Sequence, residues 1–256
     1  MNKILEAKHI TKIYNRYTKN EFEALHDISL DVYEGDFICI MGPSGSGKST
    51  LINNLSTIDM PTKGSVIING TNVFQMMETQ VGRFRYENLG FIFQSFNLMD
   101  TLTLKENISL PLILSGTSAE QIDIQVHKIA EKLDLLDELH KYPIECSGGQ
   151  CQRCAVARAL VNNPKLIVAD EPTGNLDSKN SHDLLSLLKE LNEQEKVTIV
   201  MVTHDAMIAS YSKRLLLIRD GVIDEDIEKN DMDQRDYFYK IVQANSKEAM
   251  DLLFAK

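Results

Sequence analysis

A glycine-rich segment beginning at Gly42 has the composition of a phosphate-binding loop. It fits the pattern of two glycines separated by four residues and followed by Lys-Ser. An apolar run at residues 36–41 precedes it and a helix-like run starts at Lys48, so we expect a strand, a turn and a helix, not an ordinary glycine-rich turn. In such a loop backbone N–H groups and the lysine bind phosphate, while the serine hydroxyl binds Mg²⁺. The predicted ATP-binding residues are Gly42, Pro43, Ser44, Gly45, Ser46, Gly47, Lys48, Ser49 and Thr50.

Two adjacent acids end a second apolar run, which begins at Lys165. Asp170, at the end of the predicted strand, is suited to coordinate Mg²⁺ directly or through water. Glu171 then has the position of a general base that polarises the attacking water. The alternative is a pair of acids in a solvated loop, and the phosphate-binding loop upstream makes the catalytic interpretation stronger.

A second loop, Ser147–Gln150, has the sequence Ser-Gly-Gly-Gln and precedes a helix-like run. Serine is a favoured N-cap residue, and the first N–H groups of a helix bind anions. A phosphate-binding loop and this loop in one chain resemble the ATP-binding cassette (ABC) ATPase family. The resemblance implies that Ser147, Gly149 and Gln150 bind the γ-phosphate of ATP held by a second cassette. It also implies that Asp177 links the two sites across the interface between the cassettes.

Three further residues resemble the family's ATP contacts. Gln94 follows an apolar strand and resembles the glutamine that reaches Mg²⁺ and the attacking water, so Ser49, Gln94 and Asp170 form the implied metal set. His204 follows another apolar strand and resembles the histidine that contacts the γ-phosphate, although a lone histidine is more often structural. Tyr14 resembles the aromatic residue that stacks on adenine. Tyr17 is its competitor, and an exposed loop tyrosine is the alternative.

Cysteines lie around the second loop. Cys146 stands where the family usually has leucine, and with Cys151 and Cys154 it forms a C-x4-C-x2-C spacing. Iron–sulfur proteins use such spacing, but these residues would begin a helix and Cys39 is in a distant strand, which favours free thiols. A helix N-terminus lowers a thiol pKa, so we expect oxidation or alkylation of Cys146 or Cys151 to slow ATP turnover.

Length and composition limit the class of protein. With 256 residues, 43% of them hydrophobic, the chain is expected to form one globular domain with a large core. No apolar run approaches the ~18 residues of a membrane helix. No targeting segment is evident, and the few cysteines fit a reducing cytoplasm. The net charge of −10 argues against nucleic acid as a partner.

The C-terminal region is strongly acidic. Residues 220–236 carry eight acids against Lys229 and Arg235, and we expect a solvated loop there. An amphipathic helix is predicted from about Arg235. Its apolar residues are Phe238, Ile241, Val242, Leu252 and Leu253.

The order of the patterns predicts an α/β fold. Residues 36–62 and 165–220 alternate apolar strands with helices, and residues 1–35 and 64–70 read as further strands. Helices are predicted at 104–114, 118–133 and 149–162. The resemblance implies a P-loop NTPase core, a mostly parallel sheet between helices, with an antiparallel β subdomain and an inserted helical subdomain at about 95–163. The cassette would span 3–225, with an acidic linker and C-terminal helix at 226–256.

A cassette of this kind needs a partner that uses its ATP-driven closure. The resemblance implies a second copy or a paralogous ATPase, and a membrane permease that docks near Ser95–Thr103. The chain would then lie in the cytoplasm, peripheral on the inner face of the cell membrane. The apolar residues Phe96, Leu98, Met99 and Leu102 could form the docking surface or belong to the subdomain core.

Several longer segments resemble the macrolide-export and lipoprotein-release group of ABC ATPases. The segments are 89–108, 170–178 and 202–211. Within that group they resemble most the bacitracin and lantibiotic resistance ATPases, which act against antimicrobial peptides. The alternatives are a cell-division ABC ATPase that regulates wall hydrolases, or a lipoprotein-release or macrolide-efflux ATPase.

Overall fold

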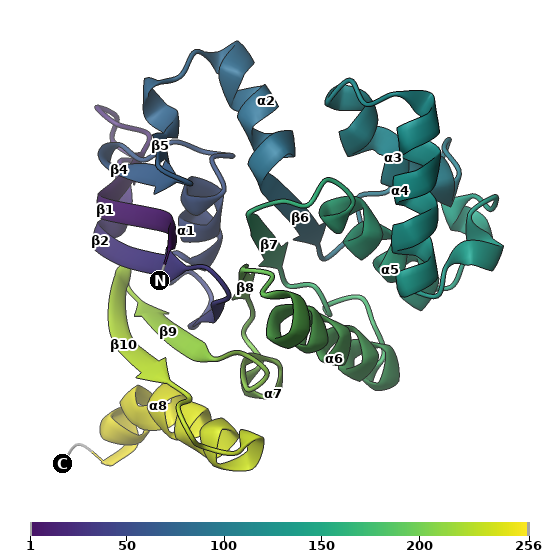
Figure 1. Cartoon of the computed structure of the whole chain (residues 1–256). Helices are drawn as coiled ribbons and strands as arrows, with labels where there is room; N and C mark the ends of the chain where they lie inside the picture. The colour runs from purple at the N-terminus through teal and green to yellow at the C-terminus, as the bar shows by residue number, and fades with distance from the viewer. Residues whose placement is uncertain (1, 255–256) are drawn as a thin grey trace. The chain divides into compact units, whose positions relative to one another are not determined.

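The computed structural model describes residues 2–254, without the side chains of Glu78 and of residues 248–254 (Figure 1). Contacts within the chain divide it into two compact units. The first unit comprises the residues up to Phe74 and those from Lys189 onward, and the second comprises Gln75–Leu188. The predicted ATP-site residues are distributed over both units.

An antiparallel sheet opens the first unit. Its strands lie in the order β2-β1-β4-β5. Their bounds are β1 (Lys3–Tyr14), β2 (Phe22–Tyr33), β4 (Lys63–Ile68) and β5 (Thr71–Asn72). Leu5 and Leu25 are fully buried because alternate side chains of a strand face the core. His9 and Asp27 are exposed at irregular points of the β1–β2 register, where both residues have positive φ. This sheet is the predicted antiparallel β subdomain.

Parallel strands form the rest of the first unit's β-structure. They are β3 (Phe37–Met41), β8 (Ile199–Val202) and β9 (Arg214–Arg219). β3 pairs in parallel with both others, and all residues of β3 and β8 are buried, as expected for parallel strands covered on both faces. Helices α1 (Lys48–Leu55) and α7 (Ala206–Ala209) follow β3 and β8. Because the strands are parallel, the loops that follow β3 and β8 leave from the same edge.

The prediction of a solvated loop at 220–236 is wrong for most of its length. Val222–Glu228 form strand β10, which pairs antiparallel with β9. Arg214 binds Asp226 through two N–H donors at 2.8 and 2.6 Å, and Arg219 Nη1 lies 3.2 Å from Asp224 Oδ2. Basic residues of β9 therefore compensate the acidic strand, and an acid count alone does not reveal that pairing.

The C-terminal helix is present as α8 (Gln234–Phe254). Ile241 is fully buried as predicted, whereas Val242 is 37% exposed. Tyr237, which the periodicity did not select, is fully buried, and its hydroxyl donates to the Ile227 carbonyl at 3.3 Å. The side chains of Leu252 and Leu253 lie outside the described part of the chain.

The second unit combines a parallel strand pair with helices. Its strands are β6 (Leu89–Phe93) and β7 (Leu166–Asp170). Its helices are α2 (Glu78–Asn88), α3 (Leu104–Leu114), α4 (Ala119–Lys132) and α5 (Gly148–Leu160), and α6 (Ser178–Glu195) begins in it. The short 3-10 turns are η1 (Val73–Gln75), η2 (Leu136–Glu138) and η3 (Pro143–Glu145). The three predicted helices are confirmed within two residues at their ends, and α2, whose sequence is largely polar, was not predicted.

The predicted fold class is confirmed. The chain has α/β content, an antiparallel β subdomain and parallel strands flanked by helices. Among residues 2–254, no helix combines the length and the apolarity needed to span a bilayer. The proposed boundaries of the cassette and of its helical subdomain stay predictions.

Candidate functional site

The phosphate-binding loop joins β3 to α1 in the first unit. Gly47 is the N-cap of α1 and has a left-handed backbone with φ 101°, and a Cβ there would lie 2.7 Å from the Ala24 carbonyl oxygen. Only glycine fits these conditions. Gly47 has no side chain that could cap α1, so no cap residue competes with an anion for the N-terminus of this helix.

Two side chains of the loop, those of Ser46 and Lys48, place hydrogen-bond donors where a ligand could use them. Ser46 is 3% exposed, yet its Oγ has no hydrogen-bond partner. Lys48 Nζ donates to the carbonyl oxygens of Gly42 and Pro43 at 2.9 and 2.8 Å, which keeps the ammonium group over the loop. Ser49 is exposed one residue further on. A cradle of N–H, hydroxyl and ammonium donors fits the oxygen acceptors of a triphosphate.

His204 lies at the same strand edge as this loop. β3 and β8 are paired in parallel up to Ile40 and Val202, and the Thr203 N–H donates to the Ile40 carbonyl at 3.2 Å. His204 comes directly after this bond and is exposed. The parallel pairing therefore brings a histidine from far along the chain to the edge where the phosphate-binding loop begins.

Two tyrosines near the end of β1 differ in how they are held. The Tyr14 hydroxyl donates to Asp59 Oδ2 at 3.0 Å, and Lys12 Nζ lies 4.9 Å from the centre of its ring. Tyr17 is 87% exposed in the following loop and contacts its neighbour Arg16. A fixed ring is the better platform for a base, which favours Tyr14 over Tyr17.

The second unit gathers Gln94, Asp170 and Glu171 at one edge. β6 and β7 are parallel with Phe93 opposite Asp170, so Gln94 and Glu171 both follow the carboxyl ends of neighbouring strands. Glu171 has φ 46°, a left-handed conformation that is unfavourable for a residue with a side chain. Such strain is concentrated at functional sites and supports a special role for this acid.

The loop after Glu171 also holds Gln94 in place. Asn175 Nδ2 donates to the Gln94 carbonyl at 3.0 Å. A Cβ on Gly174 would lie 2.4 Å from Gln94 Nε2, so the glutamine side chain lies directly over Gly174. Sequence reasoning did not select Asn175. Its position four residues after the predicted base gave no separate signal.

The Ser-Gly-Gly-Gln loop is confirmed as the start of helix α5. The Ser147 hydroxyl accepts from the Gln150 N–H at 3.3 Å, and Gln150 Oε1 accepts from the Ser147 N–H at 2.8 Å, a reciprocal capping box. Gln150 Nε2 donates to Glu138 Oε1 at 3.0 Å. The loop is therefore fixed by its own side chains. Glu138, which ties it to the η2 turn, was not anticipated.

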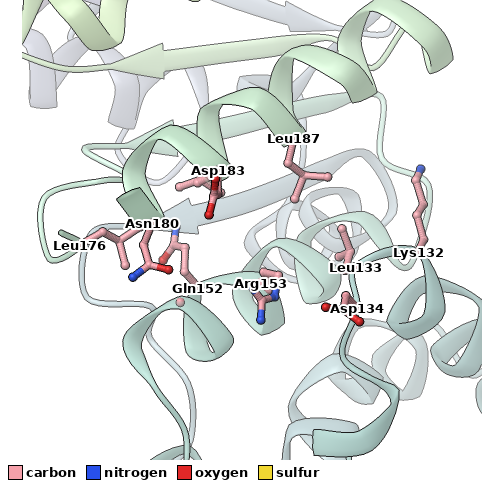
Figure 2. Close-up of a pocket in the computed structure, with 11 residues that line it drawn as sticks. Lys132, Leu133, Asp134, Gln152, Arg153, Leu176, Asn180, Asp183 and Leu187 are labelled. Carbon is pink, nitrogen blue, oxygen red and sulfur yellow. The ribbon is translucent and has the colours of Figure 1, made fainter. Parts of the chain in front are cut away.

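Asp177 is connected to this loop through Asn180. The two oxygens of Asp177 accept from the backbone N–H and the side-chain amide of Asn180 at 2.8 and 2.7 Å. These hydrogen bonds lower the pKa of Asp177 and keep its carboxylate ionised. A Cβ on Gly149 would lie 2.6 Å from Asn180 Oδ1, and Figure 2 shows Asn180 at the start of α6 beside α5.

Arg158 supports the segment that follows Gln94. Its guanidinium donates to the Phe96 carbonyl at 2.7 Å and also to the Asn97 carbonyl. Phe96 and Asn97 both have positive φ, so the arginine stabilises an unfavourable bend. Burial lowers the pKa of Arg158. The sequence offers no signal for this contact because it joins residues far apart in the chain.

The expected activation of the cysteines near α5 is wrong. The Cys146 and Cys151 thiols donate to the carbonyls of Tyr142 and Pro143, and burial raises the pKa of both. Burial also raises the pKa of Cys154 to about 12. All four cysteines are free thiols. Desolvation of the thiolate outweighs the helix N-terminus here, so these thiols stay protonated near neutral pH.

Known proteins give an independent view of the chain. A family model described as "ABC transporter" matches residues 25–174. The chain is 47% identical to the ABC transporter ATP-binding protein YxdL of Bacillus subtilis (strain 168), over 94% of this chain and 92% of the relative. It is 46% identical to the bacitracin export ATP-binding protein BceA of Halalkalibacterium halodurans, over 94% of each chain.

A solved structure agrees with these relatives. The ATP-binding cassette MJ0796, in a dimeric post-hydrolysis state bound to ADP and Pi, superposes with a TM-score of 0.80 and 38% identity, covering 88% of this chain and 98% of that one. Sequence family, fold and the phosphate-binding loop thus lead to one assignment. The chain belongs to the ABC transporter family, as an ATP-binding subunit with a P-loop ATPase fold.

Proposed function

We propose that this ATPase drives a membrane permease that protects a cell against antimicrobial peptides. The observation that carries the proposal is the 46% identity to a bacitracin export ATP-binding protein along 94% of each chain. A single aligned stretch of that length includes the phosphate-binding loop, the acidic strand β10 and the first part of helix α8. The resemblance therefore extends to parts of the chain beyond those that ATP hydrolysis requires.

The predicted site residues divide into binding and chemical roles. Lys48 and the N–H groups at the start of α1 bind the β- and γ-phosphates, and Tyr14 stacks on adenine. Glu171 polarises the attacking water as general base, and His204 contacts the γ-phosphate. Gln94 positions that water from the neighbouring strand end.

Mg²⁺ is the metal that the donor set fits. Ser49, Gln94 and Asp170 offer a hydroxyl, an amide carbonyl and a carboxylate, all of them oxygen ligands of the kind that Mg²⁺ prefers. When bound, Mg²⁺ neutralises the charge that develops on the transferred phosphoryl group. Asp170 is only partly buried at the end of β7, which leaves its carboxylate accessible to a hydrated ion.

Two cassettes are needed for a complete site in this proposal. MJ0796 is dimeric in its ADP- and Pi-bound state. In the proposed assembly Ser147, Gly149 and Gln150 of one copy face the γ-phosphate bound by the other, and Asp177 lies at the interface. The second cassette is a copy of this chain or a paralogue.

We also propose where the permease docks. The second unit has a groove of about 400 Å³ between α2, β6, α3 and α5, lined by apolar side chains that include Phe91, Phe93 and Leu114. From the predicted docking segment Ser95–Thr103, Asn97 lines this groove. Met99 is 50% exposed. An apolar groove of this kind accepts the apolar face of a short permease helix, which would keep the chain at the inner face of the membrane.

A susceptibility assay tests the transport part of the proposal. The gene for this chain is deleted from its host, and the strain is complemented with wild type or with Glu171→Gln. Wild type is expected to restore growth on bacitracin, and Glu171→Gln is not, because hydrolysis is lost while ATP binding persists. Equal bacitracin sensitivity of the parent and deleted strains would reject peptide resistance as the function.

Copurification tests the partner. Tagged Glu171→Gln is isolated with ATP from detergent-solubilised native membranes, with Lys48→Ala as the matched control that cannot close on ATP. A permease is expected with Glu171→Gln in excess over Lys48→Ala. Recovery of a cell-division permease with wall hydrolases would replace the resistance assignment by the regulatory one.

A further inference from the structure

A small pocket lies beside the Ser-Gly-Gly-Gln loop in the second unit. It has a volume of about 210 Å³ and lies between the end of α4, the start of α5 and the first half of α6 (Figure 2). The backbone of Gly149 forms part of its wall. Apart from Gly149, the residues that line this pocket have no ATP-binding role in the proposal above.

An unpaired buried acceptor lies in the wall of the pocket. Gln152 is 1% exposed, and its Nε2 donates to the Pro172 carbonyl at 2.9 Å, which fixes the orientation of the amide. Its Oε1 has no hydrogen-bond partner. A buried acceptor left unpaired costs about 1–3 kcal/mol. An occupant that carries an N–H or O–H donor would remove this cost.

A cation without a partner belongs to the same pocket. Arg153 lines the same pocket, and its Nε is buried without a partner. Within residues 2–254, Arg153 has neither an ion pair nor a hydrogen bond, although Asp134 and Asp183 line the pocket as well. A guanidinium is well suited to bind a carboxylate through two N–H groups.

The remaining wall is mainly apolar. Leu133, Leu176, Leu184 and Leu187 come from three different segments and line the space, and Figure 2 shows Leu187 on α6 and Leu133 at the end of α4. The volume exceeds the roughly 150 Å³ of an engineered cavity that holds benzene. It is below the roughly 300 Å³ at which pockets for drug-sized ligands begin. The pocket therefore has the size and the apolar wall to suit a single small molecule with an apolar body.

We propose that this pocket binds an apolar α-amino acid of about the size of leucine. The carboxylate binds Arg153, the ammonium group donates to Gln152 Oε1, and the side chain packs on the leucines. The pocket thus offers a cation for the carboxylate, an acceptor for the ammonium group and an apolar wall for the side chain of one amino acid.

Occupancy should slow ATP turnover, a consequence that rests on the proposed function. Asn180 lines the pocket, holds Asp177 through two hydrogen bonds and lies against Gly149. A ligand that contacts Asn180 restrains both Gly149 and Asp177. Gly149 is proposed to face the ATP of a second cassette, and Asp177 is proposed to lie at the interface between the cassettes.

Direct binding is the first test. Nucleotide-free wild-type protein is titrated calorimetrically with L-leucine, and with L-leucinamide, which lacks the carboxylate. We expect saturable binding of one leucine per chain, and at least tenfold weaker binding of leucinamide. Absence of saturable leucine binding would mean that ordered water satisfies the pocket, and would overturn the proposal.

Three variants localise the site. Arg153→Met removes the cation and Leu187→Phe fills the space at a half-buried position, so each should weaken leucine binding at least tenfold. Arg83→Met removes an exposed arginine of α2, outside the pocket, and is the matched control. Circular dichroism verifies folding of each variant. Leucine binding by folded Arg153→Met and Leu187→Phe with wild-type affinity would locate the ligand elsewhere.

ATP turnover with and without leucine is the second readout. We expect leucine to reduce turnover of wild type by at least half and to leave turnover of Leu187→Phe unchanged. If bound leucine leaves ATP turnover unchanged, the proposed regulation of ATP hydrolysis by this pocket is wrong. Absence of ATPase activity in every sample would instead reject the proposed function, because leucine binding is measured without nucleotide.

Discussion

The two loops proposed to bind phosphate are built in opposite ways. The loop before α1 ends in Gly47, which has no side chain to cap the helix, and encloses the unpaired hydroxyl of Ser46. The loop before α5 ends in Ser147, which forms a reciprocal capping box with Gln150. The first loop therefore leaves its polar groups for a ligand, while the second satisfies its own cap groups without one.

This difference assigns a distinct task to each loop. An open loop gains hydrogen bonds when phosphate arrives, so its binding energy is large and its ligand-free form is less stable. A self-capped loop keeps its shape whether or not a nucleotide is near, which suits a surface that must recognise ATP held by another cassette.

Glu171→Gln should leave both loops intact and abolish the chemistry. Loss of the general base is expected to reduce ATP turnover about 10²–10⁴-fold. ATP affinity should stay near that of wild type because Gln keeps the shape of the side chain. Steady-state phosphate release and equilibrium ATP binding measure the two effects. Turnover within threefold of wild type would remove Glu171 as the base.

Lys48→Ala should disable the open loop alone. The variant loses the ammonium group that Gly42 and Pro43 hold over the loop. Productive ATP binding is expected to be lost, because the lysine provides the charged donor for the β- and γ-phosphates. Fluorescence titration with a labelled ATP analogue measures it. Unchanged affinity and rate would contradict the assignment of this loop.

Ser46→Ala and Ser147→Ala form a matched pair for the two loops. Ser147→Ala removes a helix cap, and the free energy of unfolding should fall by about 0.5–2 kcal/mol. Ser46→Ala removes a buried hydroxyl without a partner, so stability should stay the same or rise while ATP affinity falls. Urea unfolding without nucleotide compares the variants. Equal destabilisation by Ser46→Ala and Ser147→Ala would contradict the proposed difference between the two loops.

The pH dependence of the free energy of unfolding at alkaline pH tests the burial of the Cys154 thiol on α5. Burial raises the pKa of Cys154 from 9.0 to about 12, so the folded state favours the protonated thiol. Its contribution to stability is complete below pH 9 and is lost as pH rises toward 12. Cys154→Ala should flatten this part of the curve in urea unfolding at several pH values. Cys146→Ala, at a half-buried thiol, is the control with the smaller change.

Local patterns predicted much of the fold. The strands at 36–41 and 165–170, the helix starting at Lys48 and the cap at Ser147 follow from apolar runs, glycines and a serine within a few residues of one another. α2 was missed because its residues are largely polar and show no apolar stripe. The strand at 222–228 was missed because the acids were counted over residues 220–236, a range that excludes Arg214 and Arg219 on β9, which pair with two of those acids.

The sequence by itself determined which residues we propose to bind phosphate, because loop chemistry depends on residue type and on short spacing. It could not determine which residues hold those groups in place. Three contacts that hold them join segments far apart in the chain. They are Asn180 with Gly149, Arg158 with the bend after Gln94, and the Gln152 amide with the Pro172 carbonyl. Burial likewise reversed the expected thiol activation, because desolvation depends on what surrounds a side chain in three dimensions.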